Sequence, residues 1–227
     1  MPESNTSSLV DAEMDCLERT FQSREARLGW AHPQTVEAAI LLADELKEFC
    51  AHEKAEALYR QSLQVLEAGG RDEPEMFECR LKLSHILRRR VAAGELDKDS
   101  GLGEAEALNR GVVEAYERLL GPLDTATSTA VYSLARMLRT KRDFRAAEAA
   151  LLKLLEQQEQ FLGPDDSETL WTVHVLGSLF QDEKNDAGAK THFQRAAEGR
   201  ARVLGPEHEL TKVSRAALEK TIAKWLR

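Results

Sequence analysis

Apolar residues in the segment 144–161 stand three or four positions apart, with polar and charged residues between them. They are Ala147, Ala150, Leu151, Leu154, Leu155 and Phe161. This spacing places them on one face of an α-helix, because a helix repeats every 3.6 residues. The pattern therefore predicts an amphipathic helix that buries its apolar face against a neighbour.

Two short markers recur along the chain in fixed phase. The first is Leu-Gly-Pro, with copies 42 residues apart at 120–122, 162–164 and 204–206, and a Leu-Gly copy without the proline at 28–29. The second is an Ala-Glu or Ala-Lys pair that follows three of these glycines by 26 residues, at Ala55, Ala147 and Ala189. The shared phase of two independent markers indicates a structural repeat of 42 residues.

Each repeat predicts two antiparallel helices. The first helix begins near a Ser or Thr that suits an N-cap, and it carries a Leu followed by a small residue. These pairs are Leu42-Ala43, Leu83-Ser84, Leu134-Ala135 and Leu176-Gly177. The small residue lets two helix axes approach closely, and the glycine after the second helix suits a left-handed C-cap. Because one pair cannot bury its apolar face alone, neighbouring pairs must stack.

The repeat predicts an all-α fold, a right-handed α-solenoid of antiparallel, tetratricopeptide-like helix pairs with about ten helices. We assign residues 1–29 to an N-terminal capping helix, 30–208 to four helix pairs and 209–227 to a C-terminal capping helix. A further Ala-Glu pair begins at Ala105, 50 residues after Ala55, so the marker spacing is wider in the second repeat. Residues 92–103 of this repeat are rich in Gly and Asp. We interpret this insertion as a longer loop between two helices.

Composition suits an ordered protein, with 42% hydrophobic and 31% charged residues. No stretch approaches the roughly twenty apolar residues of a membrane helix, and the N-terminus shows no secretory pattern. We therefore expect a cytoplasmic location without membrane insertion. Cys16, Cys50 and Cys79 are odd in number and lack C-x-x-C spacing, so we expect buried thiols rather than disulfides or a zinc site.

Residues that could carry catalysis are scattered. The histidines form no i, i+4 pair on one helix, and Gly101-Leu102-Gly103 lacks the preceding strand of a phosphate-binding loop. No motif positions a nucleophile. We therefore expect no enzymatic activity, no cofactor and no metal site. The net charge of −8 argues against non-specific nucleic-acid binding, which depends on neutralising phosphates with Lys and Arg.

The stretch Leu28-Gly29-x-x-His32-Pro33-x-Thr35, followed by Ala55-Glu56-x-Leu58-Tyr59-Arg60, resembles the tetratricopeptide repeat of kinesin light chains. The resemblance covers nearly the whole chain. It implies stacked helix pairs and a scaffold that binds protein or peptide partners. Kinesin light chains carry an Asn-Asn pair in the first helix of a repeat, and this sequence departs from it with Tyr132-Ser133 and His174-Val175.

The first helices of the pairs are expected to line the concave face of the array, which in helix-pair solenoids is an extended binding surface. The candidate peptide-binding residues on it are Lys82, His85, Arg88, Arg89, Tyr132, Arg136, Arg139, Trp171, His174 and Ser178. Arg binds carboxylates through paired hydrogen bonds, and aromatic side chains supply anchoring area. We therefore predict a non-catalytic scaffold that binds an acidic peptide with an apolar or aromatic anchor.

The same residues leave alternatives open. The Arg run at 88–90 also suits a solvated helix end, where cations complement the helix dipole, and Tyr132 and Trp171 also suit a core. In that case the chain is a structural subunit of a larger assembly, which it contacts through its outer faces and ends. Exposed apolar surface at those places would favour the assembly.

Overall fold

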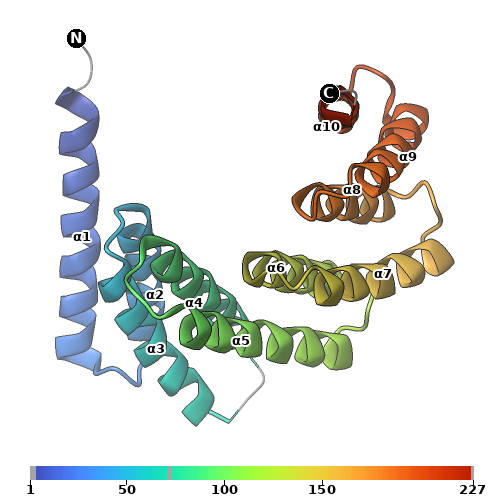
Figure 1. The fold of residues 1–227 in the computed structure, drawn as a ribbon. Helices are drawn as coiled ribbons and strands as arrows, with labels where there is room; N and C mark the ends of the chain where they lie inside the picture. Colours follow the sequence, from blue (N-terminus) through green and yellow to red (C-terminus); the bar gives the residue numbers. More distant parts are fainter. Residues whose placement is uncertain (1–3, 71–72, 226–227) are drawn as a thin grey trace. The chain divides into compact units, whose positions relative to one another are not determined.

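The computed structural model describes the backbone of residues 4–70 and 73–225 and the side chains of residues 13–70 and 73–224. Within these ranges the chain is all helical, which confirms the predicted fold class. Its ten helices are α1 (Ser4–Leu28), α2 (Pro33–Glu48), α3 (His52–Ala68), α4 (Pro74–Ala93), α5 (Lys98–Leu119), α6 (Thr125–Lys141), α7 (Phe144–Phe161), α8 (Ser167–Asp182), α9 (Asp186–Leu204) and α10 (Glu209–Trp225) (Figure 1). The outermost residues of the predicted capping helices, 1–3 and 226–227, lie outside the described residues.

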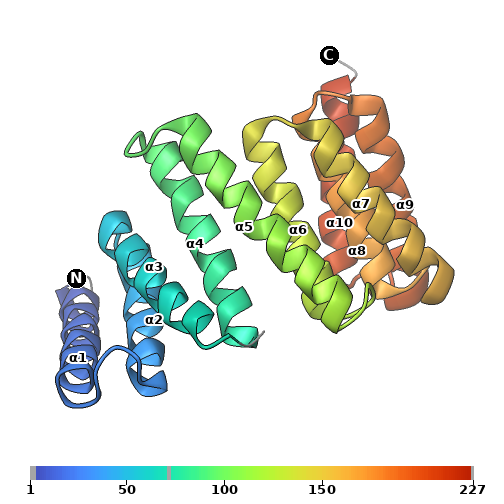
Figure 2. The same cartoon turned by 90° about the horizontal axis from the view of Figure 1, so that it is seen from below.

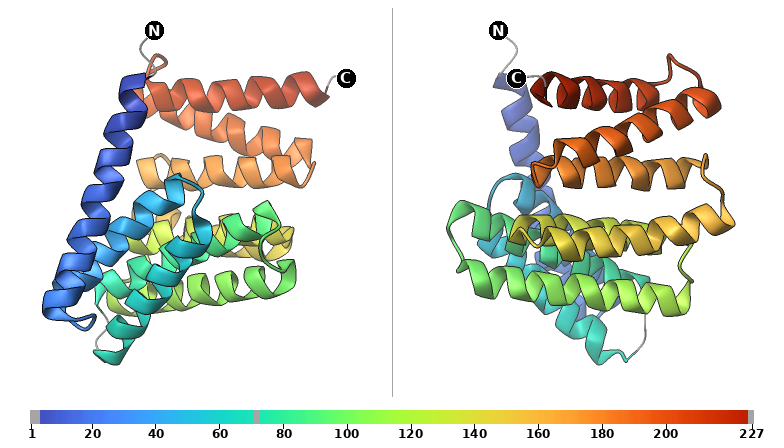
Figure 3. Two further views of the ribbon diagram at one scale, coloured as in Figure 1. Left: turned by 90° about the vertical axis from the view of Figure 1, so that its left-hand side faces the viewer. Right: turned by 45° about the vertical axis from the view of Figure 1, so that its right-hand side comes forward.

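The helices form two compact units that divide within α5, one up to Val112 and one from Val113 onward. In the first unit α1, α2, α3 and α4 pack in chain order, each against the next (Figure 2). In the second unit α6 to α10 do the same, and α6 also contacts α8. Figure 3 shows α8, α9 and α10 stacked one above another. Each unit therefore has the sequential packing of antiparallel helices that characterises an α-solenoid.

The Leu-small pairs lie in the core, as predicted. In the second unit Leu134, Ala135 and Leu176 are at most 4% exposed and belong to one apolar cluster with side chains of α7. Gly177 faces α9 so closely that a β-carbon there would lie 2.7 Å from Cδ1 of Phe193. The small residues thus set the distance between paired helices.

The predicted Ser and Thr N-caps are wrong, because aspartates cap two of these helices. Asp124 and Asp166 accept hydrogen bonds from the backbone N–H groups two residues further on, at 2.8 Å and 2.9 Å. Thr127 instead donates its hydroxyl to the carbonyl oxygen of Gly121 at 2.7 Å, which ties α6 to the preceding turn. The predicted left-handed glycine is confirmed, since Gly121 has a φ of 87°.

The insertion in the second repeat is not a long loop, and this prediction is wrong. α4 continues to Ala93 and α5 begins at Lys98, so residues 94–97 alone connect the two helices, and not 92–103. The extra residues of this repeat therefore lengthen its helices.

Packing explains why a Gly-rich segment is helical here. Asp97 accepts a hydrogen bond from the N–H of Ser100 at 2.9 Å, which caps the start of α5. Gly101 stands in the first turns, where a β-carbon would lie 2.6 Å from Cδ2 of Leu96. Glycine serves close packing at this position rather than loop formation.

The cysteines differ in their surroundings. Cys79 is buried, and its Sγ donates a hydrogen bond to the carbonyl oxygen of Tyr59 at 3.4 Å. Cys16 and Cys50 are exposed, so the prediction of three buried thiols is wrong for these two. Cys50 lies in the tight turn after α2, with a φ of 58°, where little chain is available to cover it.

Candidate functional site

Three predicted groove residues meet in the second unit, on α6 and α8. The ring centroids of Tyr132 and Trp171 lie 6.5 Å apart, edge to face, and those of Trp171 and His174 lie 5.8 Å apart in a stack. The guanidinium carbon of Arg200, from α9, lies 5.5 Å from the Trp171 ring centroid. Trp171 is nevertheless 39% exposed. The cluster presents one indole to solvent on a base of packed rings.

Tyr132 and His174 are partly buried, and their rings pack against this indole. The Tyr132 hydroxyl lies 2.7 Å from Thr172 Oγ1, and burial raises its pKa. His174 Nδ1 lies 3.2 Å from Ser214 Oγ. Burial, together with nearby Arg200, lowers the pKa of the His174 imidazole to about 4. Both rings are therefore neutral at neutral pH, and a charged ligand must pair with other residues.

The other predicted residues of this unit are Arg136, Arg139 and Ser178. Arg139 pairs with Asp182 of α8, with its Nε 2.8 Å from Oδ2. Ser178 donates its hydroxyl to the carbonyl oxygen of His174 at 3.3 Å. Arg136 is exposed, and no ion pair joins it to another residue that the structure describes. The charge of Arg136 therefore remains available to a ligand.

The remaining predicted residues lie on α4 in the first unit: Lys82, His85, Arg88 and Arg89. Lys82 Nζ lies 2.7 Å from Asp44 Oδ2 and 3.2 Å from Glu78 Oε1. Burial opposes the charged form, but the two carboxylates outweigh it and raise the pKa of Lys82. The other three side chains are partly buried. The positive charge that the sequence places at Lys82 is thus neutralised by its neighbours.

Arg90, predicted in one alternative to lie at a solvated helix end, is enclosed in an ion network. Its Nη1 lies 2.7 Å from Glu56 Oε2, and its Nε lies 3.4 Å from Glu95 Oε2. Arg60 binds the other Glu56 oxygen at 2.7 Å and Glu104 at 2.6 Å. Burial raises the pKa of Glu56, but hydrogen bonds from Arg90 and Arg60 outweigh burial and lower it overall. This network joins α3, α4 and α5.

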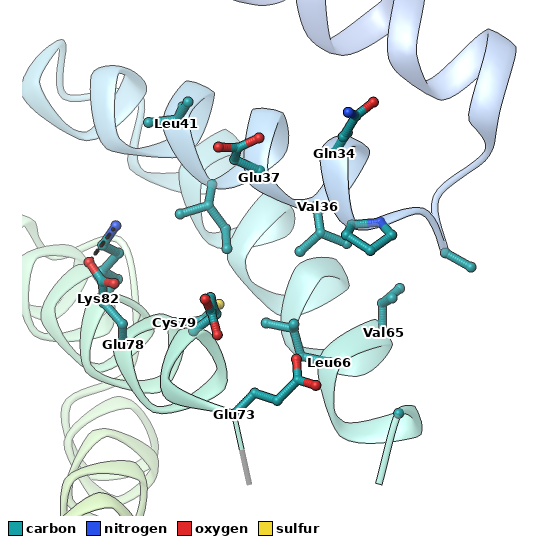
Figure 4. Close-up of a pocket in the computed structure, with 15 residues that line it drawn as sticks. Gln34, Val36, Glu37, Leu41, Val65, Leu66, Glu73, Glu78, Cys79 and Lys82 are labelled. Carbon is teal, nitrogen blue, oxygen red and sulfur yellow. Dashed lines mark ion pairs between the residues drawn. The ribbon is translucent and has the colours of Figure 1, made fainter. Parts of the chain in front are cut away.

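A cavity that the sequence pattern did not predict lies between α2, α3 and α4, with a volume of about 610 Å³. Its apolar lining includes Val36, Ile40, Leu41, Val65 and Leu66. Four glutamates also line it: Glu37, Glu73, Glu75 and Glu78. Figure 4 shows the carboxylates of Glu37, Glu73 and Glu78 around Val36 and Leu66. The run of acidic residues at the start of α4 was the sequence signal that could have indicated it.

These two surfaces differ in chemistry. One exposes the Trp171 indole above the buried guanidinium of Arg200, and the other combines apolar walls with carboxylates. Among the described residues, no group of three or more His, Cys, Asp or Glu side chains is arranged to hold a metal ion. None of the helices in the described ranges is both long enough and apolar enough to cross a membrane.

Known proteins share this arrangement of helices. Residues 128–202 match the tetratricopeptide repeat family. Among curated proteins, none matches this sequence. Two crystal structures of kinesin light chain-like repeats from Podosopora anserina, one of them a point variant, are 18% identical to this chain, with a TM-score of 0.76. The matches cover 88% and 87% of this chain and 90% of each of those chains. BtubC (BKLC) from P. vanneervenii is 18% identical over 93% of this chain and 82% of its own, with a TM-score of 0.68.

The fold is that of stacked, tetratricopeptide-like helix pairs, and the family model matches residues 128–202 of it. More particularly, its helix pairs resemble those of kinesin light chains, which confirms the resemblance predicted from the sequence. At this level of identity the likeness concerns the fold, and the function must be inferred from the surfaces.

Proposed function

We propose that this chain is a protein-interaction scaffold that acts by binding and not by catalysis, and that its second unit holds a peptide across α6 and α8. The observation that carries the proposal is the partly exposed indole of Trp171, supported by Tyr132 and His174. An aromatic side chain held on a rigid base is typical of a binding anchor site. Arg136 stands one turn along α6 from Tyr132, and a free guanidinium suits a carboxylate. We infer an acidic peptide with an apolar or aromatic anchor.

Contacts between the first helices support a continuous face in this unit. Side-chain contacts between α6 and α8, and between α8 and α10, each join residues 40 positions apart. Arg136, Ser178 and Lys220 occupy equivalent positions 42 residues apart on the three helices. Arg136 and Lys220 are exposed, so two cations flank Ser178 in the register of the repeats. An extended acidic segment fits this alternation of charge and hydroxyl.

A labelled peptide with one Trp among several Asp residues tests the proposal by fluorescence anisotropy. We expect Arg136→Glu to weaken binding about tenfold, because it replaces an attraction by a repulsion. Arg145→Glu, at an exposed position of α7, is the matched control with the same net charge, and it should change affinity by less than about twofold. Trp171→Ala should also weaken binding, while circular dichroism shows unchanged helicity.

Two further peptides complete the design. One has Lys in place of Asp, and one has Ala in place of Trp. Both should bind more weakly than the acidic, Trp-containing peptide. Equal loss from Arg136→Glu and Arg145→Glu, or equal binding of the Lys peptide, would contradict the proposal.

A row of exposed apolar side chains favours a second candidate function, that of a structural subunit in an assembly. Leu119, Phe161 and Val203 lie in the last turns of three successive second helices, 42 residues apart, and are 47%, 63% and 55% exposed. Exposed apolar patches of this kind often mark contact surfaces between proteins. Light scattering at several concentrations tests self-assembly. A mass that rises with concentration and returns to that of a monomer in Phe161→Lys supports this function, and a constant monomer mass contradicts it.

A further inference from the structure

The cavity between α2, α3 and α4 offers a place for an aliphatic side chain (Figure 4). Val36 and Ile40 of α2 and Leu66 of α3 contribute apolar walls, and Leu41 beside them is 48% exposed. Its volume of about 610 Å³ falls in the range of pockets that enclose ligand groups. A side chain seated there would leave water and contact three helices at once, which is favourable in proportion to the apolar area buried.

The charge around this cavity is strongly negative. Glu37 pairs with Arg24 at 3.2 Å, yet its side chain stays 65% exposed. Glu73 and Glu75 form no ion pair with any residue in the described part of the chain. Lys82 contributes no excess positive charge, because two carboxylates already share its ammonium group. The lining therefore carries carboxylates that no cation of its own neutralises.

The dipole of α4 accounts for part of this charge and not for all of it. Acidic residues in the first turn complement the partial positive charge of a helix N-terminus, which suits Glu75. Glu37 belongs to α2, and Glu78 lies beyond the first turn of α4. Carboxylates from two helices thus border one apolar hollow. Glu37 pairs with Arg24 and Glu78 with Lys82, so Glu73 and Glu75 carry the charge that is left without an ion pair among the described residues.

We propose that this cavity binds a basic segment of a partner protein, with an aliphatic side chain seated against α2 and α3 and flanking Lys or Arg side chains paired with the glutamates. Opposite charge steers such a segment toward the cavity and selects it over acidic competitors. Guanidinium groups pair with carboxylates through two parallel hydrogen bonds, which fixes the orientation of the segment.

The charge of the chain argues against other occupants. A second copy carries the same net charge of −8, so its approach to an acidic cavity is repelled. An acidic peptide is repelled for the same reason. The site is separate from the proposed function above, because it lies in the first unit and selects the opposite charge. Each proposal can fail without the other.

A random twelve-residue peptide library displayed on phage, selected against the full chain, identifies the preferred sequence directly, whichever protein the partner is. We expect enriched peptides to carry Leu, Ile, Val or Met next to two or more Lys or Arg residues. The most enriched peptide, synthesised with a fluorescent label, is then titrated with the protein and its variants.

The double variant Glu73→Lys/Glu75→Lys reverses the charge of two exposed carboxylates of the cavity. It should weaken binding of the selected peptide at least about tenfold. Glu156→Lys/Glu183→Lys changes two exposed glutamates of the second unit and is the matched control with the same net charge. It should change the affinity by less than about twofold, because neither glutamate lines the cavity.

A third variant separates the apolar contact from the charge. Leu41→Ser removes an exposed apolar group, so the fold should persist while the selected peptide binds more weakly. Several results would overturn the proposal: no enrichment, enrichment of acidic or uncharged sequences, or equal loss of affinity in the cavity variant and its matched control.

Discussion

Substituting Gly177 with alanine should destabilise the second unit, although alanine is the better helix former. A β-carbon at this position would lie 2.7 Å, 2.8 Å and 3.0 Å from Cδ1, Cε1 and Cγ of Phe193. Carbon atoms in favourable contact lie about 3.5–4.0 Å apart, so the ring and α8 must separate by roughly half an ångström or more. Phe193 is 1% exposed, and its ring centroid lies 5.1 Å from that of His174, so the ring has little room to move.

Two opposing effects set the change in the free energy of unfolding that Gly177→Ala causes. Forcing a methyl group into a well-packed contact costs about 1–3 kcal/mol. Replacing a helical glycine by alanine raises the free energy of unfolding by about 0.5–1 kcal/mol, because the unfolded chain has less conformational freedom. Gly111 of α5 provides the control, since nothing lies within 4 Å of a β-carbon built there. Gly111→Ala should therefore raise the free energy of unfolding by about 0.5–1 kcal/mol.

The difference between the two variants isolates the packing cost, because both gain the same backbone term. We expect Gly177→Ala to be less stable than Gly111→Ala by about 1–3 kcal/mol. Urea denaturation followed by far-ultraviolet circular dichroism measures both values. Equal stabilisation by the two substitutions would refute the reasoning, because it would mean that α8 and α9 do not approach each other as closely as the structure requires.

Three further predictions concern buried polar groups. Glu56→Ala should lower the free energy of unfolding by about 3 kcal/mol, because it leaves Arg90 without its main partner. The pKa of Glu56 is lower in the folded state than its usual 4.5, so this stabilisation is present above pH 4.5 and is lost as the pH falls further. If the difference in unfolding free energy between wild type and variant stays constant down to about pH 3, this prediction is contradicted. The pKa of His174 is about 4 in the folded state, against 6.5 when exposed, so the wild type should lose stability as the pH falls from 6.5 to 4. Thermal melts at the same pH values should show a smaller loss of stability for His174→Gln. Burial raises the pKa of the Cys79 thiol to about 12, so a thiol reagent should react with Cys16 and Cys50 in the native protein and with Cys79 only after urea is added.

Local patterns predicted the helices and most of their core-facing residues, although Phe161, expected on the buried face of α7, is 63% exposed. The Leu-small pairs and the Leu-Gly turn were predicted correctly, because helical period and a left-handed C-cap depend on residues within one or two turns. Gly101 was assigned wrongly to a loop, because the Gly- and Asp-rich composition around it is also typical of loops. Its role is set by the contact with Leu96 across a turn, and composition alone could not distinguish that contact from a loop.

For the candidate site, the sequence predicted the exposure of some side chains and not their pairing. The sequence placed Trp171 and Arg136 on first helices with other groove candidates, and both side chains are exposed in the structure. It could not predict that Asp44, 38 residues from Lys82, would neutralise that lysine. The acidic cavity was missed because the acidic run at the start of α4 does not show the apolar walls that α2 and α3 contribute.

The sequence by itself determined the number of helices, the 42-residue period and the side of each helix that faces the core. These features follow from the order of apolar, small and turn-forming residues over short distances. Only the tertiary structure decided which charges remain available and where an apolar hollow stays open. Those properties depend on distances between side chains about forty residues apart, as between Arg139 and Asp182, and such distances are set by the packing of whole helices.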